Sequence, residues 1–458
     1  MNNLPIEIDS ETSRIRAALV NSRQHSFSDA ERKLQSSRLV LRIGSDAADT
    51  PAGQAALLTA AVTGARCFGE VSVLGTLDRP LLLALPIASK TLAQAVVYLG
   101  ARLADGRVSG RTVLIGSGID EERDWSVRAF WNGWVAGVVP GRNTVAVGKS
   151  DCALAGAAAG ALAVGQAFLA EQGDHRAGRS MQQLSLWAPE LGEQGACSSG
   201  PGFNEVYLPT ALWLVGLGNL GQAYLWALTL LPYPRPQDVL LFFQDDQEVG
   251  KENWGTSVLV QRGRYGVLKT RIAEEWAIMR GFQVRRIDRR LSEQLTRSDR
   301  EPGILLAGLD RMPPRRMLGR CGFDYIIDAG LGITAADYRK VRINVFDQSG
   351  DPAQHFQDVE DQTEQMVKEL MQLATYQELA RSLADGGCGA AMLAETSVAV
   401  PFVSAVAGAL AVTQAICIAS GQAHHAAIAG DVGDLRSIRA TQGRKPDRIV
   451  VPNAPAAC

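Results

Sequence analysis

The sequence predicts an α/β fold in two similar halves, each built around a mainly parallel sheet. Three observations support this prediction: short apolar runs alternate with helical stretches, one ten-residue segment occurs twice, and a stretch rich in glycine, serine and proline separates the two copies. Alternating strand and helix patterns are typical of parallel sheets covered by helices. A chain of 458 residues is also long enough for two full-sized domains.

The apolar runs predict the strands of both sheets. In the first half they span residues 37–44, 71–75, 81–87 and 112–118, with a helical stretch at 52–68. In the second half they span residues 211–218, 238–243, 283–288, 303–309, 325–330 and 341–346. The second half therefore repeats the plan of the first more clearly.

The repeated segment reads AGALAVGQAF at 159–168 and AGALAVTQAI at 407–416, and eight of the ten positions are identical. We expect two related helices that pack closely, because alanine and glycine leave room for close contact. The alternative is two alanine-rich core helices that match by composition. The linker at 186–205 predicts a domain boundary near residue 200, which gives a first domain at 1–204 and a second at 205–458.

Composition excludes several classes of protein. The chain has 46 Lys and Arg against 48 Asp and Glu, a balance that argues against a nucleic-acid binder. Its first residues lack an apolar signal core, and the runs at 153–169 and 403–419 are too rich in alanine and glycine to predict membrane spans. Seven cysteines without a Cys-x-x-Cys pair predict neither a zinc ribbon nor a disulfide framework. We expect a soluble, cytoplasmic protein.

A nucleotide-binding loop is predicted where the first apolar strand of the second half runs into Gly216, Gly218 and Gly221 and then a helix. The first glycine permits a tight turn, the second lets the backbone approach a phosphate, and the third lets the helix pack on the strand. The helix N-terminus itself favours negative charge. In the first half Gly53 follows IGSD (43–46) too late to complete this motif, so we expect no nucleotide there.

Two acidic residues, Asp245 and Asp246, follow the next strand of the second half. An acidic side chain at this position can hold both hydroxyls of a ribose. The same carboxylate would serve NAD and ATP equally well. An NAD-dependent oxidoreductase therefore stays open at this point.

Beyond the glycine loop, the second half carries seven residues in a distinctive order. An acidic residue closes the second strand, a Val and an Asn follow, Gly-x-x-Lys opens a helix, and an Asp closes the fourth strand with an Arg five residues later. These residues are Asp245, Val249, Asn253, Gly266, Lys269, Asp310 and Arg315. In this order they resemble the ThiF-type adenylyltransferases, which include ubiquitin-activating enzymes and the sulfur-carrier activators of thiamine and molybdopterin pathways. The resemblance covers about residues 205–420, and extends to the compact activating enzymes of bacterial ubiquitin-like conjugation operons associated with phage defence.

The resemblance implies two Rossmann-like adenylation domains, the first inactive and the second active. It implies that Asp245 binds the ribose of ATP, and that Lys269 and Asn253 orient the triphosphate while a carboxylate attacks its α-phosphorus. Asp310 would hold Mg²⁺, which screens the charge that repels an anionic nucleophile. Such chemistry depends more on positioning and electrostatic stabilisation than on a protein base.

The chain also departs from the family. Thr256 stands where the family has a phosphate-binding arginine, and Arg262 or Arg264 could supply that cation instead. The family's zinc cysteines are missing. The family also takes an arginine from near the N-terminus of a partner subunit or domain, for which the candidates are Arg14, Arg16 and Arg23. The alternative for each of them is a place on a solvated helix face, which we favour for any single one.

Cys388 is the candidate nucleophile. It lies among Gly386, Gly387 and Gly389, so no bulky neighbour in the sequence shields its sulfur. Thioester-forming members of the family carry a cysteine on a segment that corresponds to residues near 350–400 here, ahead of a Pro-Phe pair that opens the closing helix. A following helix N-terminus would favour the thiolate. The alternative is an inert loop cysteine.

The resemblance implies a function in three steps: ATP-dependent adenylation of the C-terminal glycine of a ubiquitin-like protein, thioester formation on Cys388, and transfer to a ubiquitin-conjugating enzyme. A sulfur-carrier protein adenylyltransferase would share only the first step. An NAD-dependent oxidoreductase would explain Asp245 but not Asn253 and Lys269 in register, and Thr256 is compatible with a non-enzymatic scaffold. The chain would act as a monomer with its halves packed together, or as a homodimer.

Overall fold

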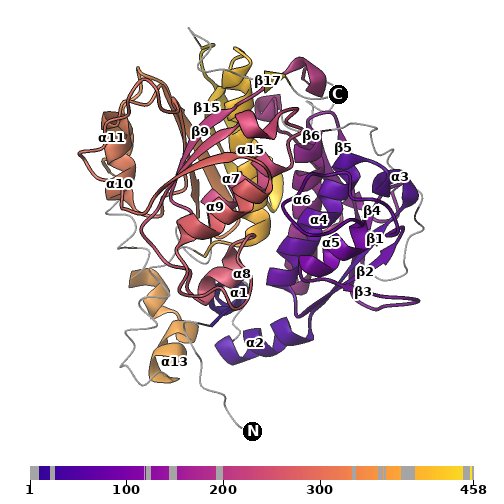
Figure 1. Ribbon diagram of the computed structural model, residues 1–458. Helices are drawn as coiled ribbons and strands as arrows, with labels where there is room; N and C mark the ends of the chain where they lie inside the picture. Colours follow the sequence, from indigo (N-terminus) through magenta and orange to yellow (C-terminus); the bar gives the residue numbers. More distant parts are fainter. Residues whose placement is uncertain are drawn as a thin grey trace.

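Two sheets lie on opposite sides of the molecule, with helices packed between them (Figure 1). The computed structural model describes residues 10–20, 26–117, 119, 125–143, 152–191, 200–332, 337–358, 365, 368–382, 398–446 and 454–455. The first half of the chain forms the right side of the view in Figure 1, and the second half forms the left. The predicted α/β fold with two mainly parallel sheets is confirmed.

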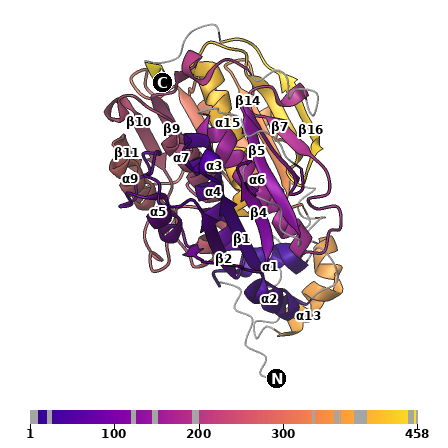
Figure 2. The same ribbon diagram turned by 90° about the vertical axis from the view of Figure 1, so that its right-hand side faces the viewer.

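The first sheet has seven strands. In spatial order they are β3 (Arg102–Leu103), β2 (Glu70–Gly75), β1 (Arg38–Ile43), β4 (Arg111–Ile115), β5 (Ser126–Asn132), β6 (Val135–Pro140) and β7 (Gln182–Ser185). Neighbours from β3 to β5 are parallel, whereas β6 and β7 are antiparallel additions at one edge (Figure 2).

The second sheet repeats this order and adds one strand. Its strands are β11 (Gln283–Ile287), β10 (Leu240–Gln244), β9 (Ala211–Val215), β12 (Ile304–Ala307), β13 (Tyr325–Leu331), β14 (Lys340–Phe346), β15 (His425–Asp431) and β16 (Asp434–Gln442). Those from β11 to β13 are parallel and the last three are antiparallel. A separate short pair joins β8 (Tyr207–Leu208) to β17 (Ala454–Pro455).

Helices of both halves connect and cover these strands. In the first half they are α1 (Ser13–Val20), α2 (Phe27–Ser36), α3 (Ser45–Ala48), α4 (Pro51–Cys67), α5 (Leu92–Tyr98) and α6 (Ala153–Glu171). In the second half they are α7 (Asn219–Thr229), α8 (Glu252–Thr256), α9 (Lys269–Met279), α10 (Met312–Met317), α11 (Pro352–His355), α13 (Ala374–Ser382) and α15 (Pro401–Ala419).

The ten-residue repeat marks equivalent helices. It falls in α6 and in α15, which are both 19 residues long, and it starts at the seventh residue of each. Each helix follows the equivalent antiparallel strand of its sheet, β6 or β14. The agreement between the two copies therefore reflects a shared position in two similar halves, and not alanine content alone.

One apolar run was predicted wrongly as a strand. Residues 81–87 form no strand, because the chain turns at Leu85 and Ile87, whose N–H groups donate to carbonyls only two residues back, at 2.8 Å in each case. The Leu82 N–H donates to the Gln54 side chain at 2.8 Å and is therefore not available for pairing with a neighbouring strand. Prolines at both ends of the run oppose a regular strand as well.

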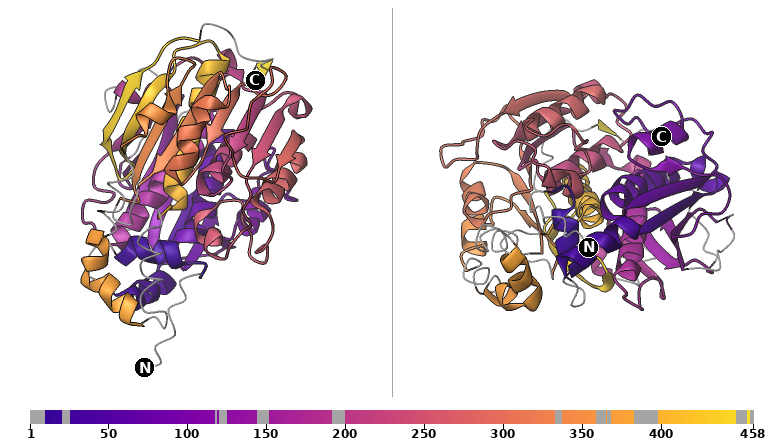
Figure 3. Two further views of the ribbon diagram at one scale, coloured as in Figure 1. Left: turned by 90° about the vertical axis from the view of Figure 1, so that its left-hand side faces the viewer. Right: turned by 90° about the horizontal axis from the view of Figure 1, so that it is seen from below.

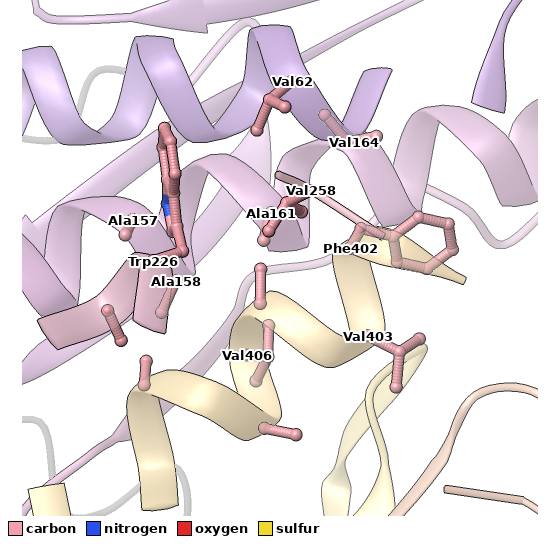
Figure 4. Packing of buried hydrophobic residues seen from close by; sticks show 14 of the residues in the cluster. Val62, Ala157, Ala158, Ala161, Val164, Trp226, Val258, Phe402, Val403 and Val406 are labelled. Carbon is pink, nitrogen blue, oxygen red and sulfur yellow. The ribbon is translucent and has the colours of Figure 1, made fainter. Parts of the chain in front are cut away.

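The core between the sheets is made of α4, α6, α7 and α15. A Cβ on Gly160 would lie 2.1 Å from the Ala56 carbonyl oxygen, so α6 and α4 touch backbone to backbone. In the second half Gly408 of α15 approaches the carbonyl of Ala223 in α7 in the same manner. Trp226 bridges the halves, since its indole N–H donates to the Thr59 hydroxyl at 3.0 Å. Figure 4 shows side chains of all four helices meeting there.

Helices α6 and α15 are long and apolar enough, by length and composition, to cross a membrane, contrary to the expectation from the sequence. Their most apolar windows are wholly buried, because each helix lies between its own sheet and the other half (Figure 3). A helix that is apolar all round is typical of such a position.

The outer edges of the two sheets also meet. Leu435 of β16 donates its N–H to Gln182 of β7 at 3.2 Å, and His425 Nε2 lies 2.7 Å from a carboxylate oxygen of Glu190. The β7 and β16 edges are therefore connected through side chains and not through a backbone strand ladder. The predicted division at residues 204 and 205 lies between the strands of the two sheets and stays a prediction.

Candidate active site

The glycine loop connects β9 to α7 through close backbone contacts. Gly216 has a φ of +76°, and a Cβ there would lie 2.7 Å from the carbonyl oxygen of Gly308. A Cβ on Gly221 would lie 2.2 Å from the Gly216 carbonyl oxygen, so α7 packs directly on the loop. At Gly218 a Cβ would meet nothing within 4 Å, so the backbone faces open space. This geometry suits the turn, packing and ligand-approach roles predicted for the three glycines.

Asn219 begins α7 and is the first unexpected residue of the site. Its side-chain Nδ2 and Oδ1 are both buried, and neither has a hydrogen-bond partner among the residues that the structure describes. An unpartnered buried amide is costly in a folded protein. A phosphate or ribose in the loop could satisfy it, so these residues fit a bound nucleotide.

Asp245 lies against the glycine loop. Its Oδ2 accepts a hydrogen bond from the Leu217 N–H at 2.6 Å, and its Oδ1 accepts one from the Gln247 N–H at 2.8 Å. Each carboxylate oxygen keeps a further lone pair for a ligand. Asp246 instead lies 3.1 Å from the Arg290 guanidinium, away from the loop.

Gln247 brings Lys269 to the same place. The Lys269 ammonium donates to Gln247 Oε1 at 2.6 Å, and the Lys269 backbone N–H donates to the Gln247 carbonyl at 2.9 Å. The residues around Val249 and Val267 pair like two short strands, which places Lys269 at the first turn of α9. Asp245 and Lys269, far apart in the predicted motif, therefore share one neighbour.

Asn253 has a local structural role in this structure. Its Oδ1 accepts a hydrogen bond from the Gly250 N–H at 2.9 Å and so closes the turn before α8. Thr256 is buried at the end of the same helix. Helix α8 packs on the start of α1, where a Cβ on Gly255 would lie 2.2 Å from the Glu11 carbonyl oxygen.

Asp310 is exposed just beyond β12, which lies beside β9, so its position follows the strand end predicted for it. No group of three or more potential metal ligands occurs within the part of the chain that the structure describes. Asp310 would offer one carboxylate to Mg²⁺, and its role stays a prediction. Arg315 points elsewhere: it forms a buried two-bond ion pair with Asp328 of β13.

The candidate replacement arginines are engaged with carboxylates. Arg262 lies 2.8 Å from Glu11, and Arg264 lies 2.7 Å from Glu275. Arg16 is buried and pairs with Glu31 at 3.2 Å, so it is not on a solvated helix face. Arg14 also makes an interaction, and Arg23 lies outside the described residues.

Cys388 lies outside the residues that the structure describes. Helix α13 precedes this segment and α15 follows it, and α15 begins at Pro401, as the sequence predicted. Cys67, Cys152, Cys321 and Cys417 are buried. Burial raises the pKa of each of these thiols, so none of them presents a ready thiolate.

The equivalent loop of the first half is filled by its own residues. Gly53 packs α4 on the loop much as Gly221 packs α7, because its Cβ would lie 2.0 Å from the Ala47 carbonyl oxygen. The inserted helix α3 places the Asp46 carboxylate 2.7 Å from the Ser117 N–H. Burial opposes ionisation of Asp46, but hydrogen bonds from Ser117, together with those from the backbone of Ala47 and Asp46, lower its pKa. An anion in this loop repels a phosphate.

Sequence reasoning missed Asn219, Gln247 and Asp328. Asn219 occupies a position of the glycine motif that any residue can fill. A polar residue there, at the start of a helix, could have been predicted from the sequence as a candidate ligand. Gln247 lies two residues after Asp245, but its contact with Lys269 depends on how the intervening loop folds back. The pairing of Asp328 with Arg315 joins the middle of β13 to helix α10, and the sequence contains no local pattern for such a contact.

A glycine loop between a central parallel strand and a helix, with a carboxylate closing the next strand, defines the Rossmann-like class of α/β proteins. Within this class, residues 208–422 match the BilD C-terminal domain family and residues 38–186 match the BilD N-terminal domain family. The bacterial E1-like protein BilD of Collimonas sp. (strain OK412) is 34% identical over 414 residues, which cover 88% of this chain and 87% of that protein. The chain therefore belongs to the BilD family of E1-like proteins, and the predicted resemblance is confirmed.

Solved structures of E. coli MccB also align with the chain. MccB with ATP is 13% identical, and the alignment covers 55% of this chain and 68% of MccB with a TM-score of 0.36. MccB with AMPCPP and selenomethionine-labelled MccA is 13% identical over 53% of this chain and 67% of MccB, also with a TM-score of 0.36.

Proposed function

We propose that this protein uses ATP and Mg²⁺ to adenylate the C-terminal glycine of a ubiquitin-like protein. The observation that carries the proposal is the cluster at the end of β10, where Asp245 and Lys269 meet through Gln247 beside the open glycine loop. An anion-accepting loop, an ammonium and a carboxylate are what a nucleoside triphosphate needs. Membership of an E1-like family supports the same reading.

In the proposed first step, a carboxylate oxygen of the modifier attacks the α-phosphorus of ATP. A bond forms between that oxygen and phosphorus, and the bond to the pyrophosphate oxygen breaks. The glycine loop holds the phosphates, Asp245 orients the ribose, and Lys269 stabilises the charge of the departing pyrophosphate. A magnesium ion held by Asp310 would add further charge neutralisation.

In the proposed second step, the Cys388 thiolate attacks the acyl carbonyl, AMP departs, and the modifier is left as a thioester. The thiol proton passes to solvent. A ubiquitin-conjugating enzyme would then accept the acyl group on its own cysteine. Glycine neighbours and the start of α15 support this role for Cys388.

The first step is tested by ATP–pyrophosphate exchange with the purified protein and a candidate modifier. We expect exchange by wild-type protein and a loss of 100-fold or more, by order of magnitude, for Lys269→Ala. Lys340→Ala is the control, because Lys340 is an exposed lysine of the same half that pairs with Asp337. Equal activity of K269A and wild type would contradict the assignment of Lys269.

The cysteine step is tested by a thiol-sensitive adduct between chain and modifier. We expect Cys388→Ala to abolish the adduct and to leave pyrophosphate exchange intact, whereas Cys197→Ala keeps both. An adduct that survives C388A would exclude Cys388 as the nucleophile. Exchange without any adduct in wild-type protein would favour the sulfur-carrier alternative.

A further inference from the structure

One arginine of the first half lies buried against the nucleotide-bearing half. Arg66 is in the last turn of α4, is 7% exposed, and donates from Nη2 to the carbonyl of Val260 at 2.8 Å. Its guanidinium lies 4.5 Å from the ring centroid of Trp254, which follows Asn253 in α8. Its Nε has no hydrogen-bond partner among the described residues. No carboxylate within that part of the chain forms an ion pair with it.

Arg66 and Arg262 place two guanidinium groups against Trp254, the latter 3.9 Å from the ring centroid. Arg262 is neutralised by Glu11, but Arg66 is not paired in this way. Burial, with a smaller contribution from Arg262, lowers the pKa of Arg66 to about 10. The Arg66 guanidinium is therefore still charged near neutral pH. Because burying a charge costs free energy, we infer that Arg66 has a function that a neutral side chain would not provide.

Hydrogen bonds and short backbone links, at Leu259–Val260 and at Leu217, connect Arg66 to the glycine loop. Next to Val260, the Leu259 N–H donates to Gln222 Oε1 of α7 at 3.0 Å. Gln222 Nε2 then donates to the carbonyl of Leu217 at 3.2 Å, and the Leu217 N–H donates to Asp245 at 2.6 Å. Gln222 is 2% exposed, so water does not compete for these bonds.

We propose that Arg66 is a positioning residue through which the first half holds the glycine loop of the second half in its nucleotide-binding geometry. The inference rests on the proposed function, because it concerns the same loop. In this proposal Arg66 acts through the loop segment and not through contact with the nucleotide. It fixes the segment at residues 254–260 from one side, by a hydrogen bond to the Val260 carbonyl and by stacking on Trp254, and Gln222 passes that constraint to Leu217.

The test is equilibrium binding of ATP–Mg²⁺ to the full-length chain, with no modifier needed. We expect Arg66→Met to raise the Kd roughly tenfold, since a charge-assisted hydrogen bond to the loop segment is lost. Arg66→Lys keeps the charge and one donor and should recover part of that loss. Thermal unfolding of each variant checks that it is folded.

Arg280→Met is a matched control. Arg280 is 8% exposed, donates to the carbonyls of Thr229 and Leu231, and lies 5.3 Å from the centroid of the Phe282 ring. It resembles Arg66 in burial, bonding and stacking but contacts no part of the glycine loop. We expect R280M to lower the melting temperature about as much as R66M and to change the Kd for ATP less than about twofold.

A double-mutant cycle with Gln222→Met separates positioning from general destabilisation. If Gln222 carries the effect of Arg66, the Kd of R66M/Q222M will rise by less than the product of the two single effects. A multiplicative result, or R66M binding ATP as R280M does, would overturn the inference. Wild-type protein that fails to bind ATP–Mg²⁺ would overturn the proposed function itself, so the two failures are distinguishable.

Discussion

Two neighbouring carboxylates at the end of β10 face different partners. Asp245 turns toward the glycine loop and accepts two backbone hydrogen bonds, whereas Asp246 pairs with Arg290. Both have the same charge and nearly the same place in the sequence. The direction of the side chain alone makes Asp245 a candidate ribose ligand and Asp246 a member of a surface ion pair.

We expect Asp245→Asn to weaken ATP binding roughly tenfold or more, because an amide NH₂ would replace an oxygen that accepts from the loop or from a ribose hydroxyl. Asp246→Asn removes the same charge one residue away and is expected to change the Kd less than about twofold. Both values come from equilibrium titration with ATP–Mg²⁺. Equal losses in the two variants would show that net charge, and not Asp245 itself, matters.

His424 predicts a pH dependence of stability. It is 3% exposed, its Nδ1 is buried without a partner among the described residues, and its ring lies edge-on to Tyr325. Burial, with a smaller repulsion from His425, lowers the pKa of His424, although Asp347 acts in the opposite sense. The unfolded chain therefore takes up the proton first, so this contribution to stability is present above the unfolded pKa and is lost as the pH falls below about 6.5.

The measurement is urea unfolding of wild type and His424→Phe between about pH 8 and pH 5. We expect wild type to lose more stability on acidification than H424F, because phenylalanine keeps the ring but cannot be protonated. Parallel pH profiles for the two proteins would remove His424 as the cause.

At the scale of elements, α4 and α6 meet through glycine. The close approach at Gly160 leaves no room for a methyl group against the Ala56 backbone, which cannot move aside as a side chain can. Gly165 lies on the same helix, but a Cβ there would face the ring of Phe402 at 3.1 Å. Gly160 and Gly165 have the same helical geometry, but the first contacts backbone and the second contacts a side chain.

We therefore expect Gly160→Ala to destabilise the protein by about 1–3 kcal/mol, as overpacking of a core does. Gly165→Ala should be close to neutral, since alanine favours the helix and the Phe402 ring can shift slightly. Denaturant unfolding followed by circular dichroism compares them. Similar losses in both variants would show that helix packing is not limited by the Gly160 contact.

Much of the element plan could be predicted from the sequence because it depends on local pattern. Apolar runs and a glycine turn mark β9 and α7, and helical periodicity at 52–68 marks α4. The antiparallel strand β16 was not predicted, because its side chains are mostly polar and many of its residues are exposed. Asn253 and Lys269 could be found as a motif, but Arg66 could not, since its carbonyl partner lies 194 residues away in sequence.

At the scale of the molecule, the halves share one core. Helix α15 buries its whole length against α6, α7 and the second sheet, and Tyr338 of the second half donates to Gln172 of the first at 2.7 Å. Helices α2 and α13 also lie side by side, through edge-to-face contact of Phe27 with Tyr376 (Figure 1). Neither half therefore encloses a complete hydrophobic core by itself.

We expect residues 205–458 expressed alone to aggregate or to unfold at a much lower temperature than the full chain, because the face of α15 that packs on α6 would meet water. Co-expression with residues 1–204 should restore a stable complex. The measurement is the recovered soluble fraction and its melting temperature. A stable, monomeric second half would show that the first half contributes little to folding.

The filled loop of the first half also determines how many reaction centres each molecule has. In an assembly of two identical chains, the change that places Asp46 in the loop would occur in both copies and would disable every site. Here the two loops belong to one polypeptide but differ in sequence, so one is closed and the other keeps its open space at Gly218. A single-turnover burst should accordingly release one pyrophosphate per chain, where a symmetric pair of identical halves would release two.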